Sequence, residues 1–99
     1  KLQKLLENNQ VVLVDFWTEW CGPCIMMEGS LSEFAKKYEG NVVVAKVDAT
    51  INPQLTKKYN VMGYPTQMLF FEGVEIGRSV GMRNFISLVR FIEYYLDVK

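Results

Sequence analysis

Two short runs of β-branched residues, VVLVDF at 11–16 and VVVAKV at 42–47, constrain the fold of this chain most strongly. Such nearly continuous apolar runs are typical of strands that are covered on both faces. The segment between them predicts a helix over 21–38, because its apolar residues recur at helical spacing. A helix that links two buried strands indicates an α/β protein.

The rest of the chain predicts a hairpin and three more helices. Leucines at 2, 5 and 6 indicate a short helix that ends near Asn8. Asn52-Pro53 predicts the start of another helix, with Asn as the N-cap, and this helix ends around Tyr59. The strands TQMLFF (66–71) and VEIGRSV (74–80) flank a tight turn at Glu72-Gly73. A last helical stripe contains Phe85, Leu88, Val89, Ile92, Tyr95 and Leu96.

Length and charge narrow the class of protein. The 99 residues are expected to form one domain, 1–99, and 49% of them are apolar, enough for a hydrophobic core. The 11 basic and 11 acidic residues cancel, which argues against nucleic acid as a partner. The apolar runs are too short to cross a membrane. No signal peptide is visible, but the sequence begins with Lys1 and leaves the compartment open.

The only two cysteines, in WCGPC at 20–24, admit three interpretations. A metal site within one chain is nearly excluded, because a tetrahedral site needs about four ligands and the chain has no histidine. A site shared between two chains, or a purely structural disulfide, stays open. A disulfide across so short a loop stabilises a fold by only about 2 kcal/mol.

A redox couple explains the spacing better. If Cys21 is the N-cap of a helix, its sulfur faces the N–H of Cys24, because Pro23 has no N–H. The unpaired amides and the helix dipole would lower the pKa of the Cys21 thiol. Cys24, in the first turn, would then be placed to resolve a mixed disulfide.

The segment VVLVDFWTEWCGPC resembles the active-site segment of thioredoxins, and the similarity continues through VVVAKVDATINP, VMGYPT, FFEGVEIGRSVG and the final helix. The resemblance implies a thioredoxin fold. It also implies a protein-disulfide reductase in which Cys21 attacks the substrate and Cys24 resolves the mixed disulfide. A thioredoxin reductase would restore the dithiol, so the chain would serve in electron transport and cell redox homeostasis. No cofactor is expected. Protein disulfides are the expected substrates, a monomer the expected state and the cytoplasm the expected compartment.

Two further residues take catalytic roles from this resemblance. Asp15 lies inside an apolar strand, and burial would raise its pKa and let it accept a proton from Cys24. A solvent-facing Asp15 at the strand end is the alternative, but the family places a buried aspartate here. Lys46 matches the family's lysine partner of that aspartate.

The resemblance also implies a substrate groove and a cis Tyr64–Pro65 bond. Small residues would let an extended peptide approach. The expected groove residues are Trp20, Gly22, Pro23, Met62, Gly63, Tyr64, Pro65, Val80 and Gly81. Trp17 is expected to pack beneath the site, and Met26 and Met27 are expected in the core.

Three departures from the family pattern change the expectations. Ile25 stands where many thioredoxins have lysine, which should weaken thiolate stabilisation at Cys21. Gly29 replaces a helix-kinking proline, which predicts a straighter or more mobile second half of the helix. The residues before Val11 leave no room for the family's first strand. The sheet should therefore have four strands, with an exposed edge at 42–47 that would allow dimerisation.

Two other functions compete with the reductase. One is an extracytoplasmic thiol oxidase or isomerase, although those relatives often carry histidine between the cysteines. The other is a thioredoxin-like binding module whose partner uses the surface and not the chemistry.

Overall fold

A computed structural model of the chain describes residues 1–96. Helices and strands alternate through most of this range, as the sequence pattern predicts. Their bounds are α1 Leu2–Asn8, β1 Val11–Trp17, α2 Gly22–Met26, α3 Glu28–Lys37, β2 Val43–Asp48, α4 Pro53–Lys58, β3 Thr66–Phe71, β4 Val74–Val80 and α5 Phe85–Leu96.

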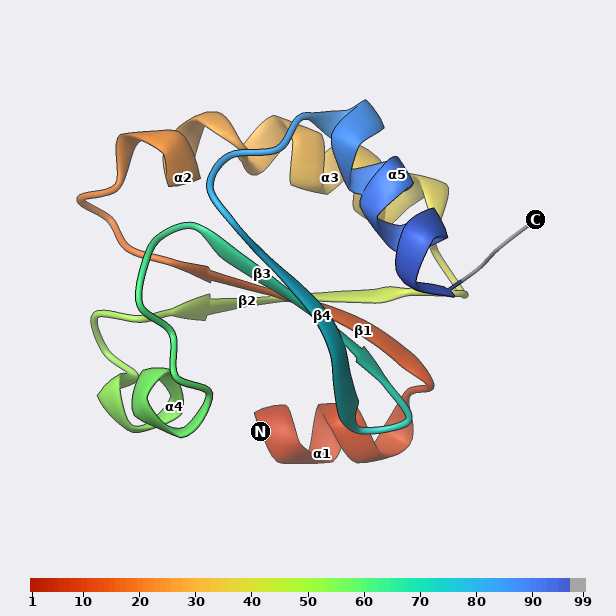
Figure 1. Cartoon of the computed structure of the whole chain (residues 1–99), viewed down its shortest axis with the longest axis horizontal. Helices are drawn as coiled ribbons and strands as arrows, with labels where there is room; N and C mark the ends of the chain where they lie inside the picture. Colours follow the sequence, from red (N-terminus) through yellow and green to blue (C-terminus); the bar gives the residue numbers. More distant parts are fainter. Residues whose placement is uncertain (97–99) are drawn as a thin grey trace.

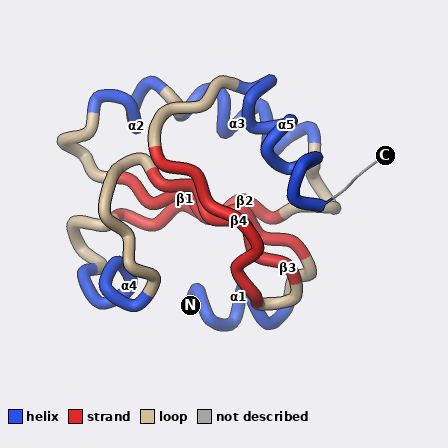
Figure 2. The backbone as a smooth tube through the Cα atoms, in the orientation of Figure 1, coloured by secondary structure: helices blue, strands red, loops and turns tan. Residues whose placement is uncertain are grey.

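The strands form one mixed sheet at the centre of the molecule (Figure 2). Within residues 1–96 this sheet has four strands in the order β2-β1-β3-β4. β1 and β2 run parallel, and β1–β3 and β3–β4 run antiparallel. The parallel pair needs a crossover, which α2 and α3 supply, whereas β3 and β4 need only a turn. The four-stranded mixed sheet expected from the sequence is therefore confirmed.

Helices cover both faces of the sheet (Figure 1). α2, α3 and α5 lie on one face, and α1 and α4 lie on the other. Successive side chains of β1 enter the two cores in turn: Leu13 packs with the helices of the first face, whereas Val12 and Val14 pack on the second. All three side chains are fully buried. This double burial is the physical reason for the unbroken apolar run in β1.

The hairpin between β3 and β4 forms as predicted. Phe71 pairs with Val74, and the two turn residues Glu72 and Gly73 have φ angles of 50° and 83°. A two-residue turn with both φ values positive matches the twist of the strands, and glycine adopts the second of these positions without strain.

The single helix predicted over 21–38 is wrong in one respect, because the chain divides it at Met27. The Met27 N–H is shared between the carbonyls of Pro23 and Cys24, at 3.1 and 3.2 Å. This sharing is typical of the last turn of a helix. Gly29 is the second residue of the following helix, α3. The interruption thus forms without a proline at position 29.

Replacing Gly29 with proline is expected to leave the protein equally stable or to stabilise it by up to about 1 kcal/mol. The first turn of a helix tolerates proline, and a Cβ built at Gly29 meets no atom within 4 Å. Thermal unfolding of Gly29→Pro and of Gly29→Ala measures the effect. If the proline variant alone loses several kcal/mol of unfolding free energy, the backbone at position 29 does not accommodate proline, and the expectation is wrong.

Smaller corrections concern element ends and one cap. β1 and β2 extend to Trp17 and Asp48, one residue beyond their predicted ends, and β2 begins at Val43. Asn52 does precede α4, but its side chain makes no capping bond, and Nδ2 donates instead to the Asp48 carbonyl at 2.9 Å. In α5 the buried face also includes Phe91, which the predicted stripe omitted.

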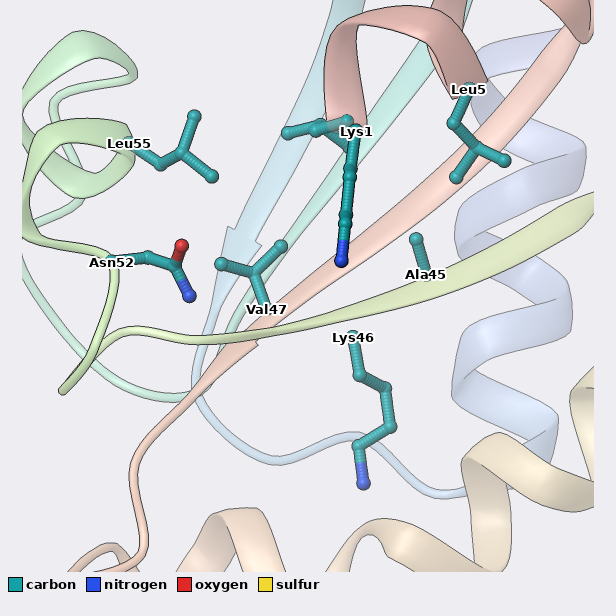
Figure 3. Close-up of a pocket in the computed structure, with 8 residues that line it drawn as sticks. Lys1, Leu5, Ala45, Lys46, Val47, Asn52 and Leu55 are labelled. Carbon is teal, nitrogen blue, oxygen red and sulfur yellow. The ribbon is translucent and has the colours of Figure 1, made fainter.

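The outer edge of β2 borders a hollow of about 350 Å³ between α1 and α4 (Figure 3). Ala45 and Val47 point into it from β2, whereas Lys46 points to the opposite face of the strand. Since β2 is the outermost strand within residues 1–96, the predicted exposed edge is confirmed. Monomer and edge-paired dimer stay predictions that sedimentation would separate.

No helix of the described range is long and apolar enough to span a bilayer.

Candidate redox-active site

The strand register brings three loops to one end of the sheet. Phe16 pairs with Thr66, and Thr66 pairs with Val80 on its other side. The end of β1, the start of β3 and the end of β4 are therefore level with one another, on the left of Figure 1. The cysteine loop, the loop before Pro65 and the loop after Val80 leave the sheet from this end, so residues distant in sequence meet there.

Cys21 is the N-cap of α2, as the spacing predicts. Its Sγ accepts a hydrogen bond from the backbone N–H of Cys24 at 3.1 Å. Pro23 stands in the first turn of the helix. The structure is the oxidised form, in which a disulfide joins Cys21 and Cys24, and their Cα atoms lie 5.2 Å apart. A sulfur in this position faces the positive end of the helix, which favours a thiolate when the bond is reduced.

The two cysteines differ in exposure. Cys24 is 3% exposed, whereas Cys21 is half-buried and reachable from solvent. An incoming sulfur can therefore approach Cys21 but not Cys24. This asymmetry separates an attacking cysteine from a resolving one.

Asp15 lies beneath this site with only 1% of its surface exposed. The pKa of Asp15 is raised from 3.8 to about 6, and burial is the main cause. The Gln67 amide and the charge on Lys46 act in the opposite direction, and the charge on Glu28 adds to the rise. A carboxyl group with a pKa near neutrality can hold or release a proton under ordinary conditions. The alternative of a solvent-facing Asp15 is excluded by its burial.

Lys46 pairs with Asp15 in the strand register but forms its ion pair elsewhere. Its Nζ lies 3.1 Å from Oε2 of Glu28 and 5.2 Å from the centre of the Trp17 ring. Both side chains of the ion pair are partly exposed. Lys46 therefore acts on Asp15 through its charge, and Glu28 holds the ammonium group to one side.

The Tyr64–Pro65 peptide bond is cis, as expected. The loops on either side of the site are joined, because the Gly81 N–H donates to the Pro65 carbonyl at 2.8 Å. Gly81 has a φ of 112°, a conformation that favours glycine. A Cβ at Gly63 would lie only 3.0 Å from Val80. These small residues leave the backbone of both loops open to an extended peptide.

Several of the predicted groove residues are large, apolar and exposed. The predicted residues Trp20, Met62 and Val80 are 82%, 87% and 62% exposed, while Gly22 and Pro23 are also exposed and Tyr64 is half-buried. Met27 is buried as predicted, but the prediction for Met26 is wrong, because its side chain is 71% exposed. Helical spacing could not separate the two residues, since only the position of α2 against the sheet decides which side is covered.

Replacing Ile25 with lysine is expected to speed the alkylation of reduced Cys21 at neutral pH. Ile25 is exposed in α2, four residues after Cys21, and a cation there would favour the thiolate. The effect should be modest, below about threefold, because the charge is solvated. Ile25→Gln is the matched control; an equal rate in the lysine and glutamine variants would contradict the electrostatic explanation.

Two residues at the site escaped the sequence analysis. Glu28 binds Lys46, and Gln67 lies opposite Asp15 in the register and is fully buried. A glutamine within the apolar strand TQMLFF was the one signal available for Gln67, because a buried amide needs polar partners. Among residues 1–96 no group of three or more potential metal ligands is assembled.

Comparisons with known proteins agree with this geometry. The sequence profile of the Thioredoxin family matches residues 2–94. A thioredoxin of Buchnera aphidicola is 38% identical over 95% of this chain and 86% of its own length. A bifunctional thioredoxin reductase/thioredoxin of Mycobacterium leprae is 40% identical over 87% of this chain but only 19% of its own length. A solved mutant thioredoxin from Halobacterium salinarum superposes with a TM-score of 0.88 at 36% identity, covering 99% of this chain and 85% of that one.

Proposed function

Because this chain belongs to the thioredoxin family, we propose a residue-level mechanism for the disulfide reduction that this membership implies. Its function is thioredoxin-type dithiol–disulfide exchange at Cys21 and Cys24. The observation that carries the proposal is the N-cap geometry: an accessible sulfur that accepts the N–H of a buried second cysteine.

In the first step the Cys21 thiolate attacks one sulfur of a substrate disulfide. The substrate S–S bond breaks, a Cys21–substrate bond forms, and the other substrate sulfur leaves as a thiolate that takes a proton. The amides at the start of α2 stabilise Cys21 as an anion before the attack. The exposure of Cys21 supports this order of events.

In the second step Cys24 attacks Cys21 and releases the reduced substrate. Cys24 must first lose a proton, and Asp15 is the proposed acceptor, because its raised pKa of about 6 lets it take up a proton near neutral pH. The positive charge on Lys46 favours the deprotonated form of Asp15, which is the form that can accept this proton. Two electrons pass to the substrate, and the Cys21–Cys24 disulfide remains.

We propose that substrate binds as an extended segment along the two joined loops. The backbone of Gly63, Tyr64, Pro65 and Gly81 would contact its main chain, in the manner of strand addition. Trp20, Met62, Tyr64 and Val80 would contact its side chains. The hydrogen bond between the Gly81 N–H and the Pro65 carbonyl supports this arrangement, since it joins the two loops.

A reductase must return electrons to the Cys21–Cys24 disulfide. We propose a thioredoxin reductase as this partner; the fusion of the two activities in the Mycobacterium leprae relative supports the pairing. We also propose the cytoplasm as the compartment, because a dithiol reductant needs a reducing environment. Cell fractionation tests this proposal: the chain should be found in the cytoplasmic fraction and not in fractions from oxidising compartments.

Turnover of a disulfide-bonded test protein provides the direct experiment. With NADPH and a thioredoxin reductase the wild-type chain should reduce many equivalents of substrate, and without the reductase it should reduce at most one. A Cys21–Cys24 reduction potential far above that of the glutathione pool would instead identify a thiol oxidase.

A further inference from the structure

A row of polar residues crosses the sheet beneath the redox site. The strand register aligns Lys46, Asp15, Gln67 and Ser79 from the β2 edge to β4. Along β1 and β3 these positions share the face of Leu13 and Leu69, which packs under α3 and α5. Burying polar groups in such a core is costly unless they are paired. The two central members, Asp15 and Gln67, are 1% and 0% exposed.

Gln67 joins this row to the substrate groove. Its Nε2 donates to the Gly81 carbonyl at 3.3 Å and contacts Sδ of Met27 at 3.5 Å. The same amide stabilises the charged form of Asp15. Oδ1 of Asp15 and Oε1 of Gln67 are buried and have no hydrogen-bond partner among residues 1–96. Gln67 is therefore the one side chain of the row that reaches both the buried acid and the groove backbone.

The amide has two N–H bonds for three acceptors. Nε2 donates to two of them in this structure, the Gly81 carbonyl and the Met27 sulfur. The third is the Asp15 carboxyl, which lies beside Gln67 in the strand register and whose Oδ1 has no partner among residues 1–96. A carboxylate is a stronger acceptor than a neutral carbonyl or a thioether. When Asp15 is ionised it attracts an N–H, and because the amide is planar, turning it toward Asp15 moves Nε2 away from the Gly81 carbonyl and the Met27 sulfur together. When Asp15 is protonated that attraction ends, and the Gly81 carbonyl is held.

We propose that Gln67 is a positioning residue that couples the ionisation of Asp15 to the binding of substrate backbone at the Gly81 carbonyl. A peptide N–H that bonds to Gly81 replaces the Gln67 donor, and the released N–H turns to Asp15. Bound substrate thereby favours the carboxylate, the form that accepts a proton from Cys24. Linkage requires the reverse as well: protonation of Asp15 weakens the hold on the peptide.

This coupling rests on the proposed function, because it assigns Gly81 to the substrate groove and Asp15 to proton acceptance. Two other charges act on Asp15, Lys46 from β2 and Glu28 from α3. They form an ion pair with each other. On the far side of Gln67, Arg83 is held by Ser79 at 2.7 Å. None of these three groups donates to Gly81, so they shift the ionisation of Asp15 without linking it to the groove.

The test measures the titration of Asp15 by NMR of its carboxyl carbon in the reduced protein. Gln67→Met keeps the bulk of the side chain and removes the donor, so the pKa of Asp15 should rise by about one unit. Met68→Leu, a buried change on the opposite face of β3, should leave the pKa unchanged. An unchanged pKa in Gln67→Met would overturn the proposal. If Gln67→Met does not fold, Gln67→Asn tests the same point, because its shorter amide cannot bridge both partners.

A second measurement separates this coupling from the proposed function. A cysteine peptide is trapped as a mixed disulfide on Cys21 of a Cys24→Ser chain, and Asp15 is titrated with the natural peptide and with peptides N-methylated at one position at a time. The natural peptide should lower the pKa of Asp15 relative to one of the methylated peptides, and Gln67→Met should abolish that difference. Equal pKa values for all peptides would overturn the coupling, even where wild-type turnover supports the reductase.

Discussion

Replacing Cys21 with serine is expected to abolish the reduction of protein disulfides. A serine hydroxyl at the same N-cap position stays protonated at neutral pH, so α2 has no anion to stabilise and the first attack does not occur. The loss should reach the level of the uncatalysed reaction. Turnover of a disulfide-bonded protein with NADPH and a thioredoxin reductase measures it.

Cys24→Ser is the matched control. It makes the same replacement of sulfur by oxygen, but at the resolving cysteine, so the first step stays intact. This variant should attack substrate once and stop as a mixed disulfide on Cys21, visible by mass spectrometry. The buried position of Cys24 prevents it from replacing Cys21 in the Cys21→Ser variant. Full biological activity of Cys21→Ser would reject the reductase in favour of a binding module.

Replacing Asp15 with asparagine should stabilise the protein by about 3 kcal/mol at pH 8, which is the second large effect. The pKa of Asp15 rises from 3.8 to about 6 on folding, a shift of about two units. Above pH 6 the native state therefore carries a buried carboxylate that the unfolded chain solvates better. Asparagine is similar in size and neutral, and its amide can donate to Oε1 of Gln67.

The sign of this effect fixes its pH dependence. The native state binds the Asp15 proton more tightly than the unfolded state, so the wild type loses stability as pH rises from about 4 to 6. The difference between Asp15→Asn and wild type should be small at pH 4, grow across this window and stay constant above it. Urea unfolding at pH 4, 6 and 8 measures it. Equal stabilities at all three values would show that burial does not raise this pKa.

Most of the fold was predictable because its signals are local. The period of apolar residues distinguishes strand from helix, and the glycine at position 73 marks a turn because it adopts a positive φ without strain. The break at Met27 was not predictable in this way. Gly29 lies two residues beyond the break, but glycine permits an interruption of a helix without requiring one.

The functional site, too, was predictable only where its signals are local. CGPC by itself predicts a nucleophile at a helix N-cap, since the proline and the spacing leave one N–H for the first sulfur. The partners of Asp15 lie on other strands and helices: Gln67 on β3, Lys46 on β2 and Glu28 on α3. The number of residues that separates each of them from Asp15 in the sequence does not predict how close its side chain lies to Asp15. Only the strand register and the helix positions bring them together.

The sequence by itself determined which segments become helix, strand and turn, and which cysteine begins a helix, because backbone preference and side-chain periodicity act over a few residues. The tertiary structure decided which polar groups surround Asp15, which cysteine is exposed, and that Met26 faces solvent while Met27 is buried. Burial and electrostatic neighbours depend on the packing of distant segments, and a single linear sequence does not state that packing.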